Sequence, residues 1–154
     1  MERAKALDRM MASCSRREYC KREIMAKLSH LEVERSEAES IVEALCREKY
    51  IDEPRYAVAF ARDKSSLQGW GPMKIRMALS AKGIDDGTIS AALDEVDHSS
   101  AEKKLRTLIA GKMRQLRSED ERTRRLKVLR YALGRGYDYD PVLQIYDELL
   151  RSER

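Results

Sequence analysis

Large aromatic rings, histidine and proline are scarce in this chain of 154 residues, which has one Phe, one Trp, two His and three Pro. Because 38% of the residues are charged, so few large side chains leave little material for one deep hydrophobic core. The regular recurrence of Leu, Ile, Val, Ala and Met argues against disorder and is typical of helical proteins. We therefore expect a thin hydrophobic core, or several small cores that follow one another along the chain.

Cysteine is also scarce, and Cys14, Cys20 and Cys46 form no Cys-x-x-Cys pair. An odd number of unpaired cysteines indicates reduced thiols in a reducing compartment. The N-terminus has no apolar signal segment, and no apolar run approaches the length that a bilayer requires. We expect a cytoplasmic protein that makes no membrane contact.

The sequence lacks recognisable catalytic and cofactor motifs. His30 and His98 are far apart, and Gly69–Pro72 lacks the Lys-Ser/Thr of a phosphate loop. The acidic pairs at 85–86 and 138–140 precede helical stripes, where capping is their expected role. No cysteine has a base pattern around it. We predict no catalytic residue, no metal and no cofactor, and therefore that the protein is not an enzyme. Stoichiometric zinc in the purified protein would instead support a metal enzyme.

Helix starts are marked by four Ser-x-x-Glu patterns, each a potential capping box that satisfies unpaired amides at a helix start. These pairs are Ser15/Glu18, Ser36/Glu39, Ser99/Glu102 and Ser118/Glu121. Proline predicts further starts at Gly71-Pro72, at Asp140-Pro141 and at Asp52 with Pro54. Glycine predicts helix ends at Gly83, Gly134 and Gly136.

Apolar residues at helical spacing predict nine helices and no strand. A matching apolar pair recurs at Ile24/Leu28, Ile75/Leu79 and Leu129/Leu133, at separations of 51 and 54 residues. This period predicts an all-α protein of three tandem three-helix repeats, at residues 1–50, 51–98 and 99–154. Because each repeat buries only a modest core, we expect neighbouring repeats to pack end to end into an elongated monomer, either straight or curved.

Basic residues are concentrated in the third repeat. Residues 101–135 contain twelve Lys or Arg against four Asp or Glu. A solvated helix face usually explains such a run, but here one sign dominates, which leaves a solvated face and an anionic partner equally open. The twelve are Lys103, Lys104, Arg106, Lys112, Arg114, Arg117, Arg122, Arg124, Arg125, Lys127, Arg130 and Arg135.

Aromatic residues near basic ones extend this candidate set. Trp70 lies between two glycines and is followed by Lys74 and Arg76; burial against a neighbouring repeat and exposure to a partner are both open to it. Tyr131 follows Arg130, and packing between repeats is its expected role, with base stacking as the alternative.

Three segments form a recognisable motif set: Tyr50-Ile51-Asp52-Glu53-Pro54-Arg55-Tyr56-Ala57, Gly69-Trp70-Gly71-Pro72-Met73-Lys74-Ile75 and Leu79-Ser80-Ala81-Lys82-Gly83-Ile84. Together these segments resemble the central signature of the RecX family. The resemblance extends over nearly the whole chain, although the family usually has two aspartates where this chain has Asp52 and Glu53. Within this signature we expect mainly structural roles for Asp52, Arg55, Ala57, Gly69, Gly71, Leu79 and Gly83.

The resemblance implies a regulator that lies on the RecA filament on single-stranded DNA and obstructs strand exchange and repressor cleavage, with no chemistry of its own. The alternative is a nucleic-acid-binding helical protein that acts without RecA and without sequence preference, with a strong salt dependence. On either view, reversing Arg122, Arg124 and Arg125 to Glu is expected to weaken partner binding and to leave thermal stability nearly unchanged.

Overall fold

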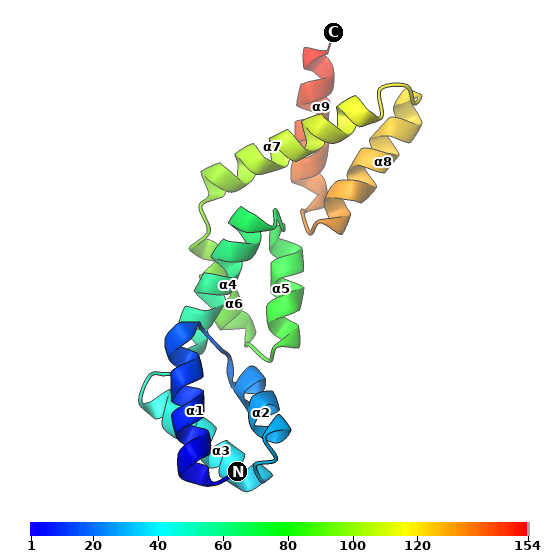
Figure 1. Ribbon diagram of the computed structural model, residues 1–154. Coiled ribbons are helices and arrows are strands. Elements are labelled where there is room, and N and C mark those ends of the chain that lie inside the picture. Colours follow the sequence, from blue (N-terminus) through cyan, green and yellow to red (C-terminus); the bar gives the residue numbers. More distant parts are fainter. Residues whose placement is uncertain (154) are drawn as a thin grey trace. The chain divides into compact units, whose positions relative to one another are not determined.

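The structure is a computed structural model that describes residues 1–153, and these residues form nine α-helices and no strand (Figure 1). The helices are α1 (Arg3–Arg16), α2 (Lys21–His30), α3 (Arg35–Arg47), α4 (Glu53–Leu67), α5 (Pro72–Ala81), α6 (Asp86–Asp94), α7 (His98–Gln115), α8 (Glu121–Gly134) and α9 (Tyr139–Ser152). The predicted all-α class is confirmed. Within the described residues, no helix is both long and apolar enough to cross a bilayer.

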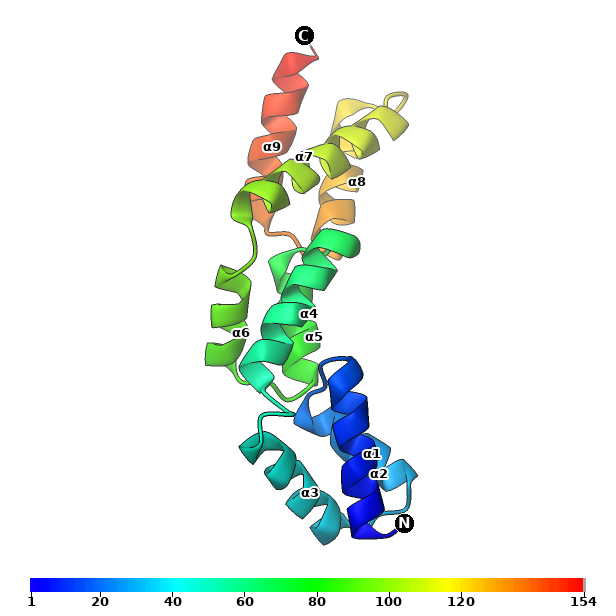
Figure 2. The same cartoon turned by 60° about the vertical axis from the view of Figure 1, so that its left-hand side comes forward.

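The chain divides into two compact units, and α4, α5 and α6 contribute to both. The first unit is Met1–Phe60 with Leu79–Ala92, and the second is Ala61–Ala78 with Leu93–Arg154. In the first, α1, α2 and α3 enclose a core that includes Ile24 and Leu28. In the second, α7, α8 and α9 pack on one another around a separate core (Figure 2). The repeat boundaries after residues 50 and 98 stay predictions.

The second helix of each repeat ends in the same backbone turn. The residue that reverses the chain has a positive φ in all three: Glu32 (61°), Gly83 (82°) and Gly136 (96°). The next amide then donates to a carbonyl five residues earlier, at 3.0 to 3.2 Å, which satisfies an orphan carbonyl of the helix. The three acceptors, Leu28, Leu79 and Ala132, are equivalent positions 51 and 53 residues apart.

This turn corrects the predicted register of the third repeat. The pair equivalent to Ile24/Leu28 is Val128/Ala132, with 1% and 0% of their surface exposed, whereas Leu133 is 40% exposed. The predicted pair Leu129/Leu133 is therefore wrong. Helix α8 has apolar residues on both faces, so hydropathy alone did not distinguish the buried face.

The four predicted capping boxes are also wrong, because each serine lies inside a helix or in a turn. Asp97 caps α7 and Asp120 caps α8, each through its carboxylate. The capping box that does form joins Cys20 and Glu23 at the start of α2. At α7 and α8, an aspartate carboxylate two residues from the serine is the stronger acceptor for the first amides and takes the place of the hydroxyl.

The proline and glycine signals were more reliable. Pro72 is the first residue of α5, and Gly83 follows the end of that helix with a positive φ. Asp52 accepts a hydrogen bond of 3.0 Å from the Arg55 amide, so the predicted cap of α4 is confirmed. These signals depend on the conformation of one or two residues, which makes them independent of the surrounding fold.

The cap of α7 offers a test of this correction. The Asp97 carboxylate accepts from the amides of Ser99 (3.1 Å) and Ser100 (3.3 Å). Asp97→Ala is expected to lower the free energy of unfolding by about 1 kcal/mol, because two amides at the helix start lose their acceptor. Ser99→Ala is expected to change the free energy of unfolding by less than about 0.5 kcal/mol. Urea denaturation of both variants decides the point, and a larger loss in the Ser99 variant would restore the serine cap.

Candidate partner interface

Four of the predicted basic residues in the third repeat are held by carboxylates. The ion pairs join Arg106 to Glu102 and Glu148, Arg124 to Glu153, Arg125 to Asp147, and Lys127 to Glu119. Three of these carboxylates belong to α9 or to the residue that follows it. A charge count over residues 101–135 overlooked these three carboxylates because they come later in the sequence. They reach the basic residues only when α9 packs on α7 and α8.

Arg124 departs most from the sequence expectation. Its side chain is buried, with 7% of the residue exposed. The guanidinium donates to both Glu153 carboxylate oxygens, at 2.9 and 2.6 Å, and its Nε and Nη2 donate to the Met113 carbonyl at 3.2 and 3.0 Å. A charge buried in this way is stable because its donors are paired. The expectation that Arg124 is as solvated as Arg122 is therefore wrong.

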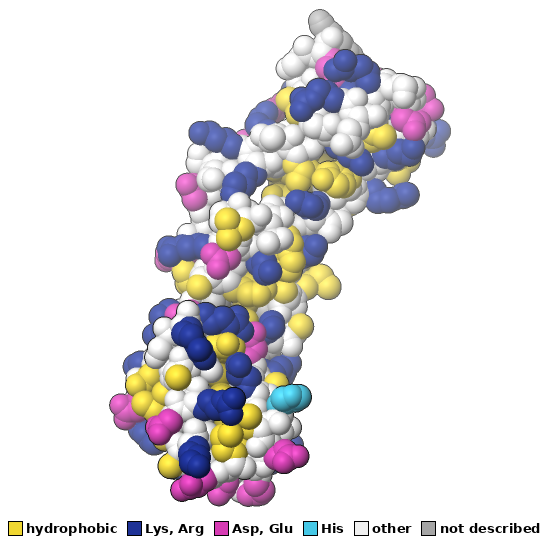
Figure 3. All heavy atoms as spheres, viewed as in Figure 1, with side chains coloured by type: hydrophobic (Ala, Val, Ile, Leu, Met, Phe, Trp, Pro, Cys, Tyr) yellow, Lys and Arg dark blue, Asp and Glu magenta, His cyan; other side chains and the backbone are white. Residues whose placement is uncertain are grey.

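The other eight predicted basic residues of the third repeat make no ion pair with a carboxylate within residues 1–153. They are Lys103, Lys104, Lys112, Arg114, Arg117, Arg122, Arg130 and Arg135. On the face shown in Figure 3, Lys and Arg side chains are spread over the region of α7, while acidic side chains gather near the α7–α8 turn. The charge of these eight cations is therefore not compensated by an ion pair within the described residues.

Three of these cations line one groove in the second unit. The groove has a volume of about 540 Å³, and its lining includes Lys103 and Lys104 of α7, Arg135 at the end of α8, and Leu67 at the end of α4, with no carboxylate. Lys104 donates to the Ser66 carbonyl at 2.9 Å, and Arg135 donates to the Gln68 carbonyl at 3.1 Å. Because these acceptors are neutral, the positive charge is not cancelled. We call this site the basic groove.

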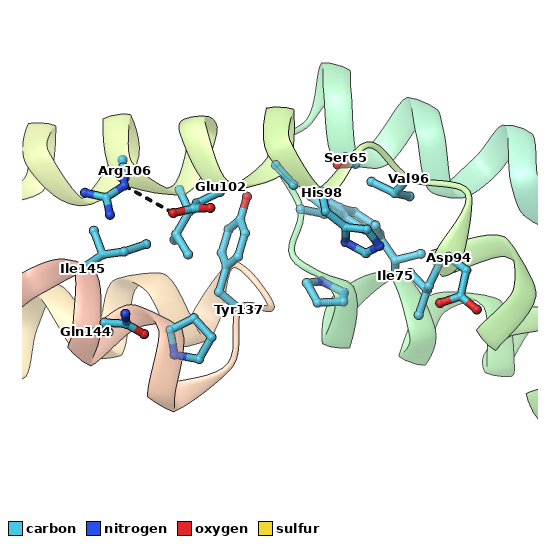
Figure 4. A pocket seen from close by; sticks show the side chains of 16 residues that line it. Ser65, Ile75, Asp94, Val96, His98, Glu102, Arg106, Tyr137, Gln144 and Ile145 are labelled. Atoms are coloured by element: carbon cyan, nitrogen blue, oxygen red, sulfur yellow. Dashed lines mark ion pairs between the residues drawn. The ribbon is translucent and has the colours of Figure 1, made fainter.

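Tyr137 separates the basic groove from a second cavity of about 510 Å³, since its ring lines both. Burial raises the pKa of the Tyr137 hydroxyl, which stays protonated and donates to the Gly69 carbonyl at 3.3 Å. Figure 4 shows that the second cavity is bordered by the Glu102–Arg106 ion pair (3.5 Å), while its interior is mainly apolar. Such a lining, with Asp94 and Glu102 among its polar groups, does not favour recognition of an anion.

Two aromatic rings of the second unit lie against cations. The cation-to-ring distances are 4.8 Å for Lys64 and 4.6 Å for Lys74 over Trp70, and 4.7 Å for Lys112 and 6.0 Å for Arg135 over Tyr131. The sequence left burial and exposure of Trp70 both open, and in the structure its side chain is half-buried. Arg76 is half-buried on α5. Lys74 therefore contacts Trp70, and Lys112 contacts Tyr131. The sequence alone did not predict these two pairings.

Two segments distant in sequence cross backbone to backbone beside the groove. The Gly71 amide donates to the Arg135 carbonyl at 2.7 Å, and the Met73 amide donates to the Gly136 carbonyl at 2.9 Å. A Cβ on Gly71 would lie 2.5 Å from the Tyr137 amide nitrogen, closer than side chains approach. Gly69, with a φ of +66°, lies against the Arg135 guanidinium. The Gly-Trp-Gly segment therefore holds the wall of the groove in place.

The other motif residues lie in the first unit and in its core. The Arg55 side chain pairs with Glu18 and donates to the Lys49 carbonyl at 3.0 Å, which ties the start of α4 to the turns before it. Ala57 and Leu79 are fully buried. Gly83 lies against the Arg22 guanidinium, and a Cβ there would be 3.1 Å from it. These contacts link the second and first repeats inside the first unit.

Comparison with known proteins identifies the family. The chain is 32% identical over 148 residues to the regulatory protein RecX of Prosthecochloris aestuarii, and the match covers 96% of this chain and 95% of that protein. This chain belongs to the RecX family. Residues 52–93, which contain most of α4 to α6, match the family model described as RecX, second three-helix domain. The RecX family consists of regulatory proteins, which agrees with the all-helical fold and the lack of a catalytic motif.

Other RecX proteins share the fold and differ in length. A solved RecX structure superposes with a TM-score of 0.86 at 27% identity, covering 94% of this chain and 71% of that one. The RecX protein of Oceanobacillus iheyensis is 26% identical over 133 residues, 86% of this chain. This chain spans about half the length of that relative, since the match covers 48% of it.

Sequence reasoning missed several residues in and beside the basic groove of this RecX chain. Gly136 was predicted only as a helix end, and its approach to Lys74 had no local signal. Leu67 is 76% exposed at the edge of the basic groove. Nothing in the sequence distinguishes it from the buried leucines of other helices. The charge balance of the whole third repeat, fourteen basic against nine acidic residues over 98–154, was the available signal that carboxylates compensate part of the basic stretch.

Proposed function

We propose that this RecX chain binds the RecA filament on single-stranded DNA and modulates its recombinase, ATPase and coprotease activities, with inhibition as the expected outcome. Membership of the RecX family carries the proposal. The chain acts in this role as a cytoplasmic monomer with no catalysis of its own and no bound cofactor. Contacts spread over successive three-helix repeats give avidity for a repeating polymer without one strong site.

The charge distribution supports a polyanionic target. The eight uncompensated cations belong to α7, α8 and their turns, and three of them meet in the basic groove. A filament that carries single-stranded DNA presents regularly spaced negative charge, which such a surface attracts over a distance set by the salt concentration. Arg124 is excluded from this role, because its guanidinium is buried and fully engaged.

Titration of the chain into RecA filaments from the same organism, assembled on single-stranded DNA, tests the proposal. ATP hydrolysis and strand exchange are followed at two salt concentrations. We expect suppression at less than one chain per RecA, persisting when single-stranded DNA is in excess. No effect, or an effect that excess DNA abolishes, would contradict the proposal.

A pair of matched variants locates the interface. Arg114, Arg117 and Arg122 are exposed cations of the third repeat, and Lys5, Arg9 and Arg16 are exposed cations of α1. Replacing the first three by Gln is expected to raise the concentration for half-suppression about ten-fold, since each exposed charge contributes about 0.5 kcal/mol. The same change in the α1 set serves as the control and is expected to have little effect. Equal losses would indicate a response to net charge alone.

The second candidate is a nucleic-acid-binding protein that acts without RecA and without sequence preference. The basic groove favours it, because its cations are available to phosphates whether or not RecA is present. This function requires tight, salt-dependent binding to DNA alone, together with loss of every effect on RecA once excess DNA competes.

A further inference from the structure

We propose that the basic groove is a direct binding site for single-stranded nucleic acid, which takes backbone phosphates on Lys103, Lys104 and Arg135 and an unpaired base or sugar on Leu67. The inference deepens the proposed function, which requires a filament that carries single-stranded DNA but does not require this chain to touch the DNA.

The electrostatics of the groove identify an anion as its ligand. Three cations line it and no carboxylate does. Lys104 and Arg135 are fixed by main-chain carbonyls, and the Nε of Arg135 is buried without an acceptor among the described residues. Lys103 is exposed and makes no ion pair within that part of the chain. Cations that are positioned by neutral groups lose little mobility on meeting a phosphate.

The hydroxyl groups of the lining contribute less to anion binding. Ser66 donates its proton to the Arg62 carbonyl at 2.8 Å, and Thr107 donates to the Lys103 carbonyl at 3.0 Å. Both protons are therefore engaged within their own helices. Ser100 also lines the groove, but the charge comes from the three cations alone, so recognition of a phosphate depends mainly on them. Such recognition is insensitive to sequence and strongly dependent on salt.

An apolar edge distinguishes a single strand from a duplex. Leu67 is 76% exposed at the edge of the groove, and Leu108 and Tyr137 also line it. An exposed leucine next to cations matches a ligand that is anionic on one side and apolar on the other. Unpaired bases present such faces, whereas a duplex hides its bases in the stack.

The test measures binding of a fluorescent oligothymidine and of a duplex of the same length, without RecA, by anisotropy over a salt series. Losing one phosphate contact lowers the salt slope for single strands by about 0.7, which weakens binding about eight-fold at about 50 mM salt and about three-fold at about 200 mM. Lys103→Gln is expected to show this loss. Lys5→Gln, which removes one exposed charge from α1, is the control and is expected to bind as the parent does.

Leu67→Ser separates the apolar contact from the charge. It is expected to weaken binding of the single strand severalfold with an unchanged salt slope, and to leave duplex binding unaltered. Circular dichroism melting checks that each variant folds. The groove assignment is overturned if the Lys103 and Lys5 variants lose the same affinity, or if Leu67→Ser weakens both DNA forms equally. If a variant that cannot bind DNA alone still suppresses RecA, the proposed function holds and the groove assignment is not needed for it. If the parent binds DNA but does not suppress RecA, the proposed function is contradicted and the groove assignment holds.

Discussion

Replacing Gly136 by Ala lowers the free energy of unfolding by about 3 kcal/mol or more. Its φ of +96° costs a residue with a Cβ about 1 to 2 kcal/mol. The added Cβ would also lie 2.6 Å from the Lys74 amide nitrogen and overlap the Lys74 Cβ, and overpacking of this kind costs about 1 to 3 kcal/mol. The hydrogen bond from the Met73 amide to the Gly136 carbonyl (2.9 Å) is strained as a result. Urea denaturation measures the loss.

Gly134→Ala is the matched control, two residues earlier in the chain. Gly134 is the last residue of α8, and a Cβ there meets nothing within 4 Å. This variant is expected to gain up to about 1 kcal/mol, because alanine loses less backbone entropy than glycine on entering a helix. If both substitutions shift the unfolding midpoint equally, the close backbone approach at Gly136 is not a feature of the folded protein.

Reversing Arg124 to Glu is the second large effect, with an expected loss of about 3 kcal/mol. The variant removes the two guanidinium donors of the Met113 carbonyl, which among the described residues keeps only the Leu116 amide at 3.3 Å, and it places a carboxylate beside Glu153. Arg122→Glu, on an exposed position of the same helix, is expected to change stability by less than about 0.5 kcal/mol. Thermal melting of the two variants checks this contrast. An equally small change in both would mean that Arg124 is solvated, as the sequence suggested.

The same ion pair predicts a pH dependence. The hydrogen bond from Arg124 holds the pKa of Glu153 below its ordinary value. A lowered pKa means that the folded state binds the proton less readily than the unfolded state, so the stability contribution is present above the unfolded pKa. It is lost as the pH falls through the lowered, folded pKa. The gap in melting temperature between the parent and Glu153→Gln is therefore expected to narrow over that acidic range and to stay constant near neutral pH.

Local signals in the sequence predicted the secondary structure well where one residue dominates its own conformation. Pro72 starts α5 and Gly83 ends it because a fixed φ or a missing Cβ acts without help from other segments. The Ser-x-x-Glu patterns at Ser99 and Ser118 failed because an aspartate two residues from each serine caps the helix. At α7, the choice between Asp97 and Ser99 depends on where the first turn forms, and the serine pattern does not specify that position.

Candidate site residues were harder to predict because their environment comes from other segments. Lys103 and Arg106 have the same charge and lie three residues apart, yet one lines the basic groove and the other pairs with Glu148 of α9. The apolar pattern of α8 likewise fits both Val128/Ala132 and Leu129/Leu133, and packing against α7 and α9 buries only the first pair.

The sequence by itself determined that this protein is all-helical, that its helices recur with a period of about 50 residues, and that it resembles the RecX family, because helix periodicity, turn residues and short motifs are local properties. Only the tertiary structure decided which cations remain uncompensated, which face of α8 is buried, and why Gly71 and Gly136 must lack a side chain. Each of these depends on segments such as 69–74 and 135–137, which are about 65 residues apart in the chain and meet only after the helices pack.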